Sequence, residues 1–449
     1  MGSENCWFLL LVLLLECIST HVTGVKRDIL STKTSYLWSH DVTSPITKNE
    51  YTTVNFKGRT CTAVHVNGIF RHGLRYPSAG DMRDMTLLQN KLAPNVRNAK
   101  YDFLKTWNNT YPIDKANFLH DMGKEELHAI GSRLGKRLFS LIDGNMDTIH
   151  FVSSSTQRTK ASAQELFSGL SLGVGDAQST AITPQINDNL TRYFDMCKLY
   201  SSSVDTNITV LKEYSSFLTG DLFRNVISAN EARLGLTNSS LSADDILMIY
   251  KTCAAELASY NRSDTWCSIQ TDDEREILEY ASDIEDYYLR GYGVPINTAM
   301  ACPIVQDLVN SIEHVIHNHN HHLNYSVAKF VFGHSDTVTH LANRLSLFRD
   351  QQPLLASNFD VMRNRKYIVS HTTPFSANIV FVLYNCHQGN GRPLETDYIL
   401  RLLVNDEPEA LNCGDSICRY VDTDFRNIVG CNFDEICRND NMLSGVIVG

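Results

Sequence analysis

The heptapeptide RHGLRYP at residues 71–77 places an imidazole between two guanidinium groups. Arginine offers forked N–H donors that match phosphate oxygens. Nearby positive charge favours the neutral form of His72, which keeps one ring nitrogen free to act as a nucleophile. Gly73 lets the backbone turn closely around a ligand. The pattern therefore predicts that His72 attacks phosphorus while Arg71 and Arg75 bind phosphoryl oxygens; a surface loop with ordinary charges is the alternative interpretation.

Apolar runs of strand length must position this segment. One of them, residues 60–70, directly precedes the heptapeptide, and others lie at 149–153, 327–332, 379–384 and 398–404. Apolar runs without strict alternation are typical of strands covered on both faces, and helical patterns lie between them, at 123–141 and 303–316. We therefore predict an α/β fold, a mixed and mostly parallel sheet flanked by helices, which binds ligands at the carboxyl ends of its strands.

The segment 197–298 has a different composition. It is polar, carries helical patterns at 243–257 and 273–289, and has few strand-like runs. We predict that it forms a mainly α-helical cap inserted into an α/β domain that spans 25–449.

Residues 1–24 have the pattern of a signal peptide. The apolar run CWFLLLVLLL at 6–15 is too short to span a bilayer, and Val22 and Gly24 stand at plausible cleavage positions. A signal anchor is the alternative, because residues 1–5 contain no Lys or Arg. We expect a protein that is secreted or resides in the lumen of the secretory pathway, without membrane attachment once the signal is removed.

The charge of the chain excludes one class of partner. The 449 residues include 40 Lys and Arg against 50 Asp and Glu, a formal charge of -10. Nucleic-acid binding needs a basic footprint, so we expect no such partner. A hydrophobic content of 43% with 20% charged residues is that of a globular protein. Positive charge for an anionic ligand must be concentrated locally.

Cysteines and sequons agree with export. Of 12 cysteines, Cys6 and Cys17 lie in the predicted signal, and the even remainder favours disulfides. Zinc is the alternative, but the close pairs have four and five intervening residues rather than two. Cys253 with Cys267 and Cys413 with Cys418 are disulfide candidates. Glycosylation is expected at the sequons Asn108, Asn189, Asn207, Asn238, Asn261 and Asn324.

Together with RHGxRxP, three further stretches resemble the histidine acid phosphatases, the branch of the histidine phosphatase superfamily that includes secreted phytases. The inositol polyphosphate phosphatase group is the most similar within that branch. The resemblance extends over about 61–411 and includes 151–170, which begins FVSSSTQR. There a polar turn opens a helix and presents free N–H groups to an anion. The resemblance implies that Arg158 binds phosphate; an ordinary helix-surface arginine is the alternative.

The stretch FGHSDT at 332–337 follows another predicted strand. The resemblance implies that His334 donates to the phosphate, and that Asp336 protonates the leaving alkoxide and later activates water. Ser-Asp-Thr is also an N-cap signal, and the two roles are compatible. The chain departs from the family here. The inositol polyphosphate phosphatases read His-Ala-Glu, so Asp336 occupies the glutamate place with one methylene less.

The last stretch, 348–386, resembles the C-terminal half of the same group, where it implies a scaffold role. It also implies a bridge between Cys61 and Cys386. His371 is expected to pack or to face solvent rather than line the site.

Two other histidine patterns are interpreted as structural. In His120-Asp121, the aspartate is expected to start a helix. The run 314–322 contains five histidines, and we expect a solvated loop rather than a specific metal site. No metal or other cofactor is expected, because the arginines and His334 supply positive charge.

These observations predict a metal-independent phosphomonoesterase that works through a phosphohistidine. The implied substrates are inositol polyphosphates such as phytate. The pH optimum is acidic if Asp336 must begin protonated. The alternatives are a broad-specificity acid phosphatase and a catalytically weak secreted protein that binds phosphorylated ligands.

Overall fold

The structure is a computed structural model that describes residues 30–40, 45–176, 181–236, 240–387, 394, 397–423, 425 and 430–438. The predicted signal peptide at 1–24 and the sequon at Asn238 lie outside these residues. Within the described ranges, no helix is both long and apolar enough to cross a membrane.

A mixed sheet forms the centre of one lobe. Among the described residues it has nine strands in the order β4-β3-β5-β2-β6-β7-β8, with β1 beside β2 and β9 beside β7. Strands β2, β3, β4 and β5 run parallel, whereas β6 and β7 are antiparallel to their neighbours. The strands are β1 Thr53–Phe56, β2 Arg59–Arg71, β3 His150–Ser153, β4 Gln185–Ile186, β5 Ala328–Gly333, β6 Asn378–Asn385, β7 Tyr398–Val404, β8 Glu407–Pro408 and β9 Ile417–Arg419. The predicted α/β class is confirmed.

Helices cover both faces of the sheet because its central strands are apolar on both sides. Alternate residues of β2 enter different apolar clusters: Ile69 lies in one and Phe70 in the other. Helices α5 (Asp121–Arg137) and α7 (Gln157–Val174) cover the Phe70 face, and α15 (Cys302–Asn320) and α16 (Ser335–Arg344) cover the Ile69 face. A Cβ on Gly169 of α7 would lie 2.1 Å from the His128 carbonyl oxygen of α5, so glycine permits this close helix pair.

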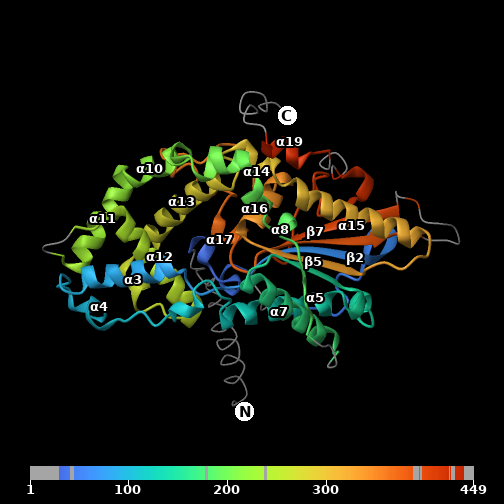
Figure 1. The fold of residues 1–449 in the computed structure, drawn as a ribbon, viewed down its shortest axis with the longest axis horizontal. Coiled ribbons are helices and arrows are strands. Elements are labelled where there is room, and N and C mark those ends of the chain that lie inside the picture. Colours follow the sequence, from blue (N-terminus) through green and yellow to red (C-terminus); the bar gives the residue numbers. More distant parts are fainter. Residues whose placement is uncertain are drawn as a thin grey trace, which may run out of the picture.

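A helical lobe lies beside the sheet (Figure 1). It contains α10 (Lys212–Leu218), α11 (Asp221–Leu234), α12 (Ala243–Tyr260) and α13 (Asp272–Leu289), all from the segment predicted as a cap. Helices α3 (Ala79–Leu92) and α4 (Phe103–Thr106) lie in the same lobe and share its apolar cluster through Leu88 and Leu104. The boundaries 197 and 298 stay a prediction, since residues outside that segment help to build the lobe.

The remaining elements are short. They are the helices α2 Tyr36–Ser39, α6 Phe139–Ile142, α8 Asp188–Thr191, α9 Lys198–Tyr200, α14 Pro295–Ala299, α17 Val369–Thr372 and α19 Phe433–Arg438, the 3₁₀ turns η1 Ser31–Lys33, η2 Ala99–Tyr101, η3 Ile113–Lys115, η4 Met146–Thr148, η5 Tyr193–Met196, η7 Ile208–Leu211, η8 Trp266–Ile269 and η10 Tyr420–Asp422, and the π turn η6 Ser201–Asp205.

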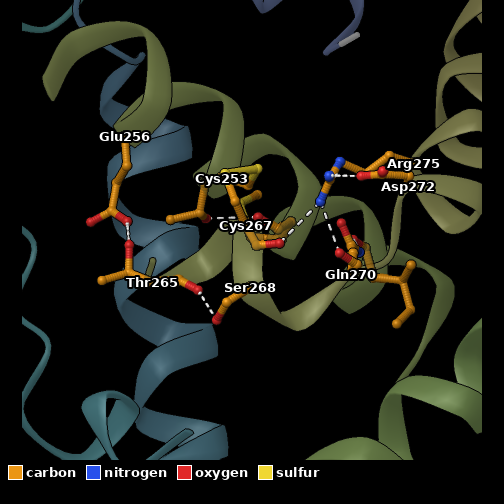
Figure 2. Close-up of a disulfide and its surroundings, with 11 residues drawn as sticks. Cys253, Glu256, Thr265, Cys267, Ser268, Gln270, Asp272 and Arg275 are labelled. Carbon is orange, nitrogen blue, oxygen red and sulfur yellow. Dashed lines mark hydrogen bonds and ion pairs between the residues drawn. A yellow bond between two sulfur atoms is a disulfide. The ribbon is translucent and has the colours of Figure 1, made fainter. Parts of the chain in front are cut away.

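Disulfides connect distant parts of the chain. The structure contains the candidate pairs Cys61–Cys386, Cys253–Cys267 and Cys413–Cys418, and also Cys197–Cys437 and Cys302–Cys431. Figure 2 shows how Cys253 of α12 holds η8 through Cys267. Arg275 of α13 donates to the carbonyl oxygens of Cys267 and Gln270, so three segments of the helical lobe are joined around this one bridge.

The described sequons lie at the surface. Asn108, Asn189, Asn261 and Asn324 are exposed, and Asn207 is partly buried. Their glycosylation stays a prediction.

Candidate active site

Three parallel strands end side by side at one edge of the sheet. Arg71, the last residue of β2, pairs with Gly333, the last residue of β5, and Ser153 at the end of β3 pairs with Phe332. Because parallel strands present their carboxyl ends at the same edge, the segments that follow them meet there. This register brings together stretches that are far apart in the sequence.

His72 is held in one tautomer. Its Nδ1 lies 2.9 Å from the Gly73 carbonyl oxygen, which only accepts, so Nδ1 carries the proton and Nε2 keeps its lone pair. Among the described residues, Nε2 has no hydrogen-bond partner. The residue is 3% exposed. Burial, followed by the charges of Arg71 and Arg158, holds the pKa of His72 well below its usual value, so the imidazole is neutral.

Arg71 and Arg75 extend from the same turn. Arg71 Nη1 donates to the carbonyl oxygens of Thr32 at 2.7 Å and Thr373 at 2.6 Å. Its guanidinium lies over the Phe375 ring, with Cζ 4.4 Å from the ring centroid. Arg75 Nη1 donates to the Tyr76 carbonyl oxygen at 2.9 Å. These partners are neutral, so they orient the guanidinium groups without neutralising their charge.

Arg158 contacts His334 across the site. Arg158 Nη2 donates to His334 Nδ1 at 3.3 Å, so the other ring nitrogen carries the proton and lies 3.2 Å from Ser154 Oγ. Burial and Arg158 lower the pKa of His334 to about 3. The rings of His72 and His334 are 5.6 Å apart, centroid to centroid. In the structure both nitrogens of His334 have protein partners, so donation to a phosphate requires that one of these contacts be exchanged.

Asp336 is the second residue of α16 and forms an ion pair. Its Oδ1 accepts from Arg290 Nε at 2.8 Å, and its Oδ2 accepts from Ser335 Oγ at 3.3 Å. Burial alone would raise the pKa of Asp336, but Arg290 and the nearby His340 hold it below its usual range. Asp336 is therefore held as a carboxylate, whereas donation to a leaving group requires its protonated form.

A cavity of about 310 Å³ opens at this point, which we call the main crevice. The predicted catalytic and phosphate-binding residues all line it: Arg71, His72, Arg75, Arg158, His334 and Asp336. Thr156 and Ser335, at the N-termini of α7 and α16, line it too. Free N–H groups of two helices thus add to the cationic side chains around a site suited to an anion.

Other lining residues were missed from the sequence: Thr32, Lys33, Arg192 and Arg290. None belongs to a recognisable motif. Thr32 and Lys33 arrive from the N-terminal turn η1, and Arg290 follows the end of α13. The only signal was that they are isolated polar residues, and many surface residues share that property.

The residues interpreted as structural lie elsewhere. His120 is the N-cap of α5, and Asp121 is an exposed residue of its first turn that pairs with Lys124. His371 is exposed. The expectation of a loop at 314–322 is wrong, because α15 continues to Asn320 and carries His314, His317 and His319. Within the described ranges no group of three or more metal-ligating side chains is suited to hold a metal ion.

Comparisons with known proteins agree on one family. A model described as "Histidine phosphatase superfamily (branch 2)" matches residues 64–405. The chain is 29% identical over 409 residues to multiple inositol polyphosphate phosphatase 1 of Gallus gallus, covering 89% of each chain. It is 27% identical over 367 residues to the protein of that name from Homo sapiens, covering 78% of this chain and 75% of the relative. The solved complex of Bifidobacterium longum multiple inositol polyphosphate phosphatase with inositol hexasulfate has a similar fold, with a TM-score of 0.67 at 17% identity, covering 86% of this chain and 95% of that one.

Proposed function

Because the chain belongs to branch 2 of the histidine phosphatase superfamily, we propose that it hydrolyses phosphate monoesters through a phosphohistidine at His72. The observation that carries the proposal is the state of this imidazole. It is neutral, its Nδ1 proton is bound to the Gly73 carbonyl oxygen, and its Nε2 is left without a partner among the described residues. That nitrogen belongs to a residue lining a crevice rich in arginine.

In the first step, His72 Nε2 forms a bond to phosphorus while the bond from phosphorus to the ester oxygen breaks. Negative charge on the transferring phosphoryl oxygens is stabilised by Arg71, Arg75 and Arg158. Asp336 gives its proton to the departing oxygen, which would otherwise leave as a poor alkoxide. The products are the free alcohol and phosphohistidine, with Asp336 as a carboxylate.

In the second step, water attacks phosphorus. Asp336 accepts a proton from this water as the new oxygen–phosphorus bond forms, and the nitrogen–phosphorus bond breaks. Inorganic phosphate leaves, His72 returns to the neutral state and Asp336 is protonated again. No other reactant is needed.

We infer inositol polyphosphates as the substrate class. The relatives named multiple inositol polyphosphate phosphatase 1 from Gallus gallus and Homo sapiens support the inference, as does the excess of positive charge around the main crevice. A substrate with several phosphates presents more negative charge than a monophosphate, and several cations are available to bind it.

We propose a secreted or lumenal location. Five disulfides within the described residues support an oxidising compartment. The predicted signal peptide and the exposed sequons agree with it.

The test is a phosphate-release assay on phytate. Native protein should release phosphate, while His72→Ala should lose nearly all turnover and Asp336→Asn should lose most of it. His314→Ala, an exposed histidine on α15, is the matched control and should match the native rate. Trapping a phosphorylated chain with native protein but not with His72→Ala would identify the nucleophile. Full turnover by His72→Ala would refute the proposal.

One observation favours a second candidate, a protein that binds phosphorylated ligands with little turnover. The Arg290–Asp336 ion pair stabilises the ionised form of the proposed acid. If purified protein binds phytate at pH values from 4 to 7 and releases no phosphate, this second function replaces the first.

A further inference from the structure

Arg290 occupies the junction of two cavities. It lines the main crevice and also a neighbouring space of about 200 Å³, which we call the adjoining cavity. Thr32 and Lys33 line both cavities as well, so the two spaces share one wall. The reacting centre and the adjoining cavity therefore both border Arg290.

Two carboxylates hold the guanidinium in place. Nε donates to Asp336 Oδ1 at 2.8 Å, and Nη1 donates to Asp286 Oδ1 at 3.0 Å. Asp286 is itself fixed, because its Oδ2 accepts from the Tyr367 hydroxyl at 2.8 Å. Among the described residues, Nη2 of Arg290 has no acceptor. One edge of the guanidinium thus positions Asp336 and a further N–H group is free for a ligand.

The adjoining cavity is lined by more cations than carboxylates. Lys33 and Lys251 line it together with Arg290, against one carboxylate, Glu285. Neither ammonium group has a hydrogen bond or an ion pair with any described residue, although the charge of Asp81 acts on both lysines. The charge of Arg75, followed by burial, lowers the pKa of Lys33. Cations that lie close together repel one another, and a bound anion stabilises them.

Asp336 responds to more than one neighbour. The charged or titratable groups that act on it from the surrounding elements are Arg290, His340, His334, Asp286, Arg71, Arg158, Tyr193, Tyr200 and Asp195. Among the cations of the described residues, Arg290 has the largest effect and the only direct contact with Asp336, so a change at this guanidinium has the largest consequence for the proton affinity of the carboxyl group.

We propose that Arg290 couples the binding of a second phosphate group in the adjoining cavity to the uptake of the catalytic proton by Asp336. Arg290 is a positioning residue in this scheme, and the scheme rests on the proposed function of the main crevice. A phosphate at Nη2 offsets the guanidinium charge, so Asp336 takes a proton from solvent more readily. Asp336 is then protonated when a polyphosphorylated substrate is bound and is ionised otherwise.

The test compares two substrates with the same kind of leaving group, inositol monophosphate and phytate. For each, kcat is measured from pH 3 to 8. With native protein, the alkaline limb of the profile, that is, the pH at which kcat falls on the alkaline side, should be about one unit higher for phytate than for inositol monophosphate. At a fixed pH on that side of the profile, this shift corresponds to a tenfold difference between the two relative kcat values. In Arg290→Gln, the limb for the monophosphate should rise toward that for phytate, so the difference should fall by at least half. The KM for phytate should also rise by about tenfold, with less effect on the monophosphate.

Two variants separate coupling from damage to the fold. Arg290→Lys keeps the positive charge, so the alkaline limb of kcat for the monophosphate should stay at the low pH of the native protein. Arg233→Gln breaks a comparable partly buried pair, with Glu274, away from both cavities, and should move neither limb. The effect of each variant is compared with native protein on the same substrate, so ionisation of the substrate cancels in that comparison.

Coincident limbs for the two substrates in native protein would overturn the coupling, as would a difference that survives in Arg290→Gln. Equal shifts in Arg290→Lys and Arg290→Gln would also overturn it, because charge would then not be the cause. His72→Ala keeps the two proposals apart. If it retains turnover, the proposed function fails; if it is inactive while the limbs coincide in native protein, only the coupling fails.

Discussion

Two arginines of the helical lobe and the three predicted phosphate-binding arginines of the main crevice have opposite surroundings. In the helical lobe, Arg365 pairs with Asp283 and Arg233 pairs with Glu274. In the main crevice, Arg71, Arg75 and Arg158 contact carbonyl oxygens or a histidine, and none forms an ion pair with a described carboxylate. A paired guanidinium has its charge balanced inside the fold. The three unpaired ones are held by neutral acceptors and keep their charge for a ligand, whereas Arg290 and Arg192, which also line the main crevice, pair with Asp336 and Asp195.

The largest effect is expected where a buried pair is broken. Arg365 and Asp283 have side chains that are 2% and 0% exposed, and Arg365 Nε donates to Asp283 Oδ2 at 2.6 Å. Arg365→Gln leaves the carboxylate buried without its cation, so the free energy of unfolding should fall by about 3–5 kcal/mol. Urea titration measures this change. Phosphate release per folded molecule should be unchanged; a selective loss of turnover without a loss of stability would remove the distinction between the two regions.

The second largest effect is expected in the main crevice, and it should appear in turnover rather than in the free energy of unfolding. Arg158→Gln should lower kcat/KM for phytate by about 10²–10³-fold, or ~2.7–4 kcal/mol of transition-state stabilisation. Its free energy of unfolding should stay the same or rise, because the variant relieves repulsion among cations. Lys160→Gln, an exposed cation on the same helix, is the control and should change neither quantity. A large drop in stability for Arg158→Gln would place Arg158 with the structural arginines.

The smallest effect concerns His65, which is neutral because it is buried, whereas His72 is neutral because of burial and nearby arginines. His65 lies in β2, where Nδ1 is 2.7 Å from the Ser326 carbonyl oxygen and Nε2 is 3.2 Å from Ser311 Oγ. Burial lowers the pKa of His65 to about 4. The unfolded chain therefore binds a proton that the folded chain does not, and stability is lost as the pH falls from about 6.5 toward 4.

Between pH 6.5 and 5, this one group should cost up to about 2 kcal/mol of unfolding free energy. His65→Gln should remove that part of the pH dependence, whatever it does to stability at neutral pH. Urea titrations at the two pH values give the difference directly, with His314→Gln as the control. Unlike the imidazoles of the main crevice, His65 should be insensitive to added phosphate. An unchanged pH dependence in His65→Gln would contradict burial as the cause.

Local sequence was sufficient where a functional group stands next to the element that positions it. The predicted strands at 60–70, 149–153 and 327–332 correspond to β2, β3 and β5, and the residues following them reach one crevice. The sequence did not predict that α3 and α4 pack in the helical lobe, because their apolar residues do not show which partner they contact. It also left open the pairing of Cys197 with Cys437 and of Cys302 with Cys431.

The sequence by itself determined where the predicted nucleophile lies, since His72 is one residue beyond β2 and the chain geometry of a strand end carries it to the edge of the sheet. Only the tertiary structure decided the charge of the proposed acid and the orientation of the arginines. The charge of Asp336 depends on Arg290, 46 residues away, and the orientation of Arg71 depends on the Thr32 and Thr373 carbonyl oxygens. The physical reason is that electrostatic interactions act through space, so the proton affinity of a buried group is set by whichever charges the fold brings within a few ångströms of it.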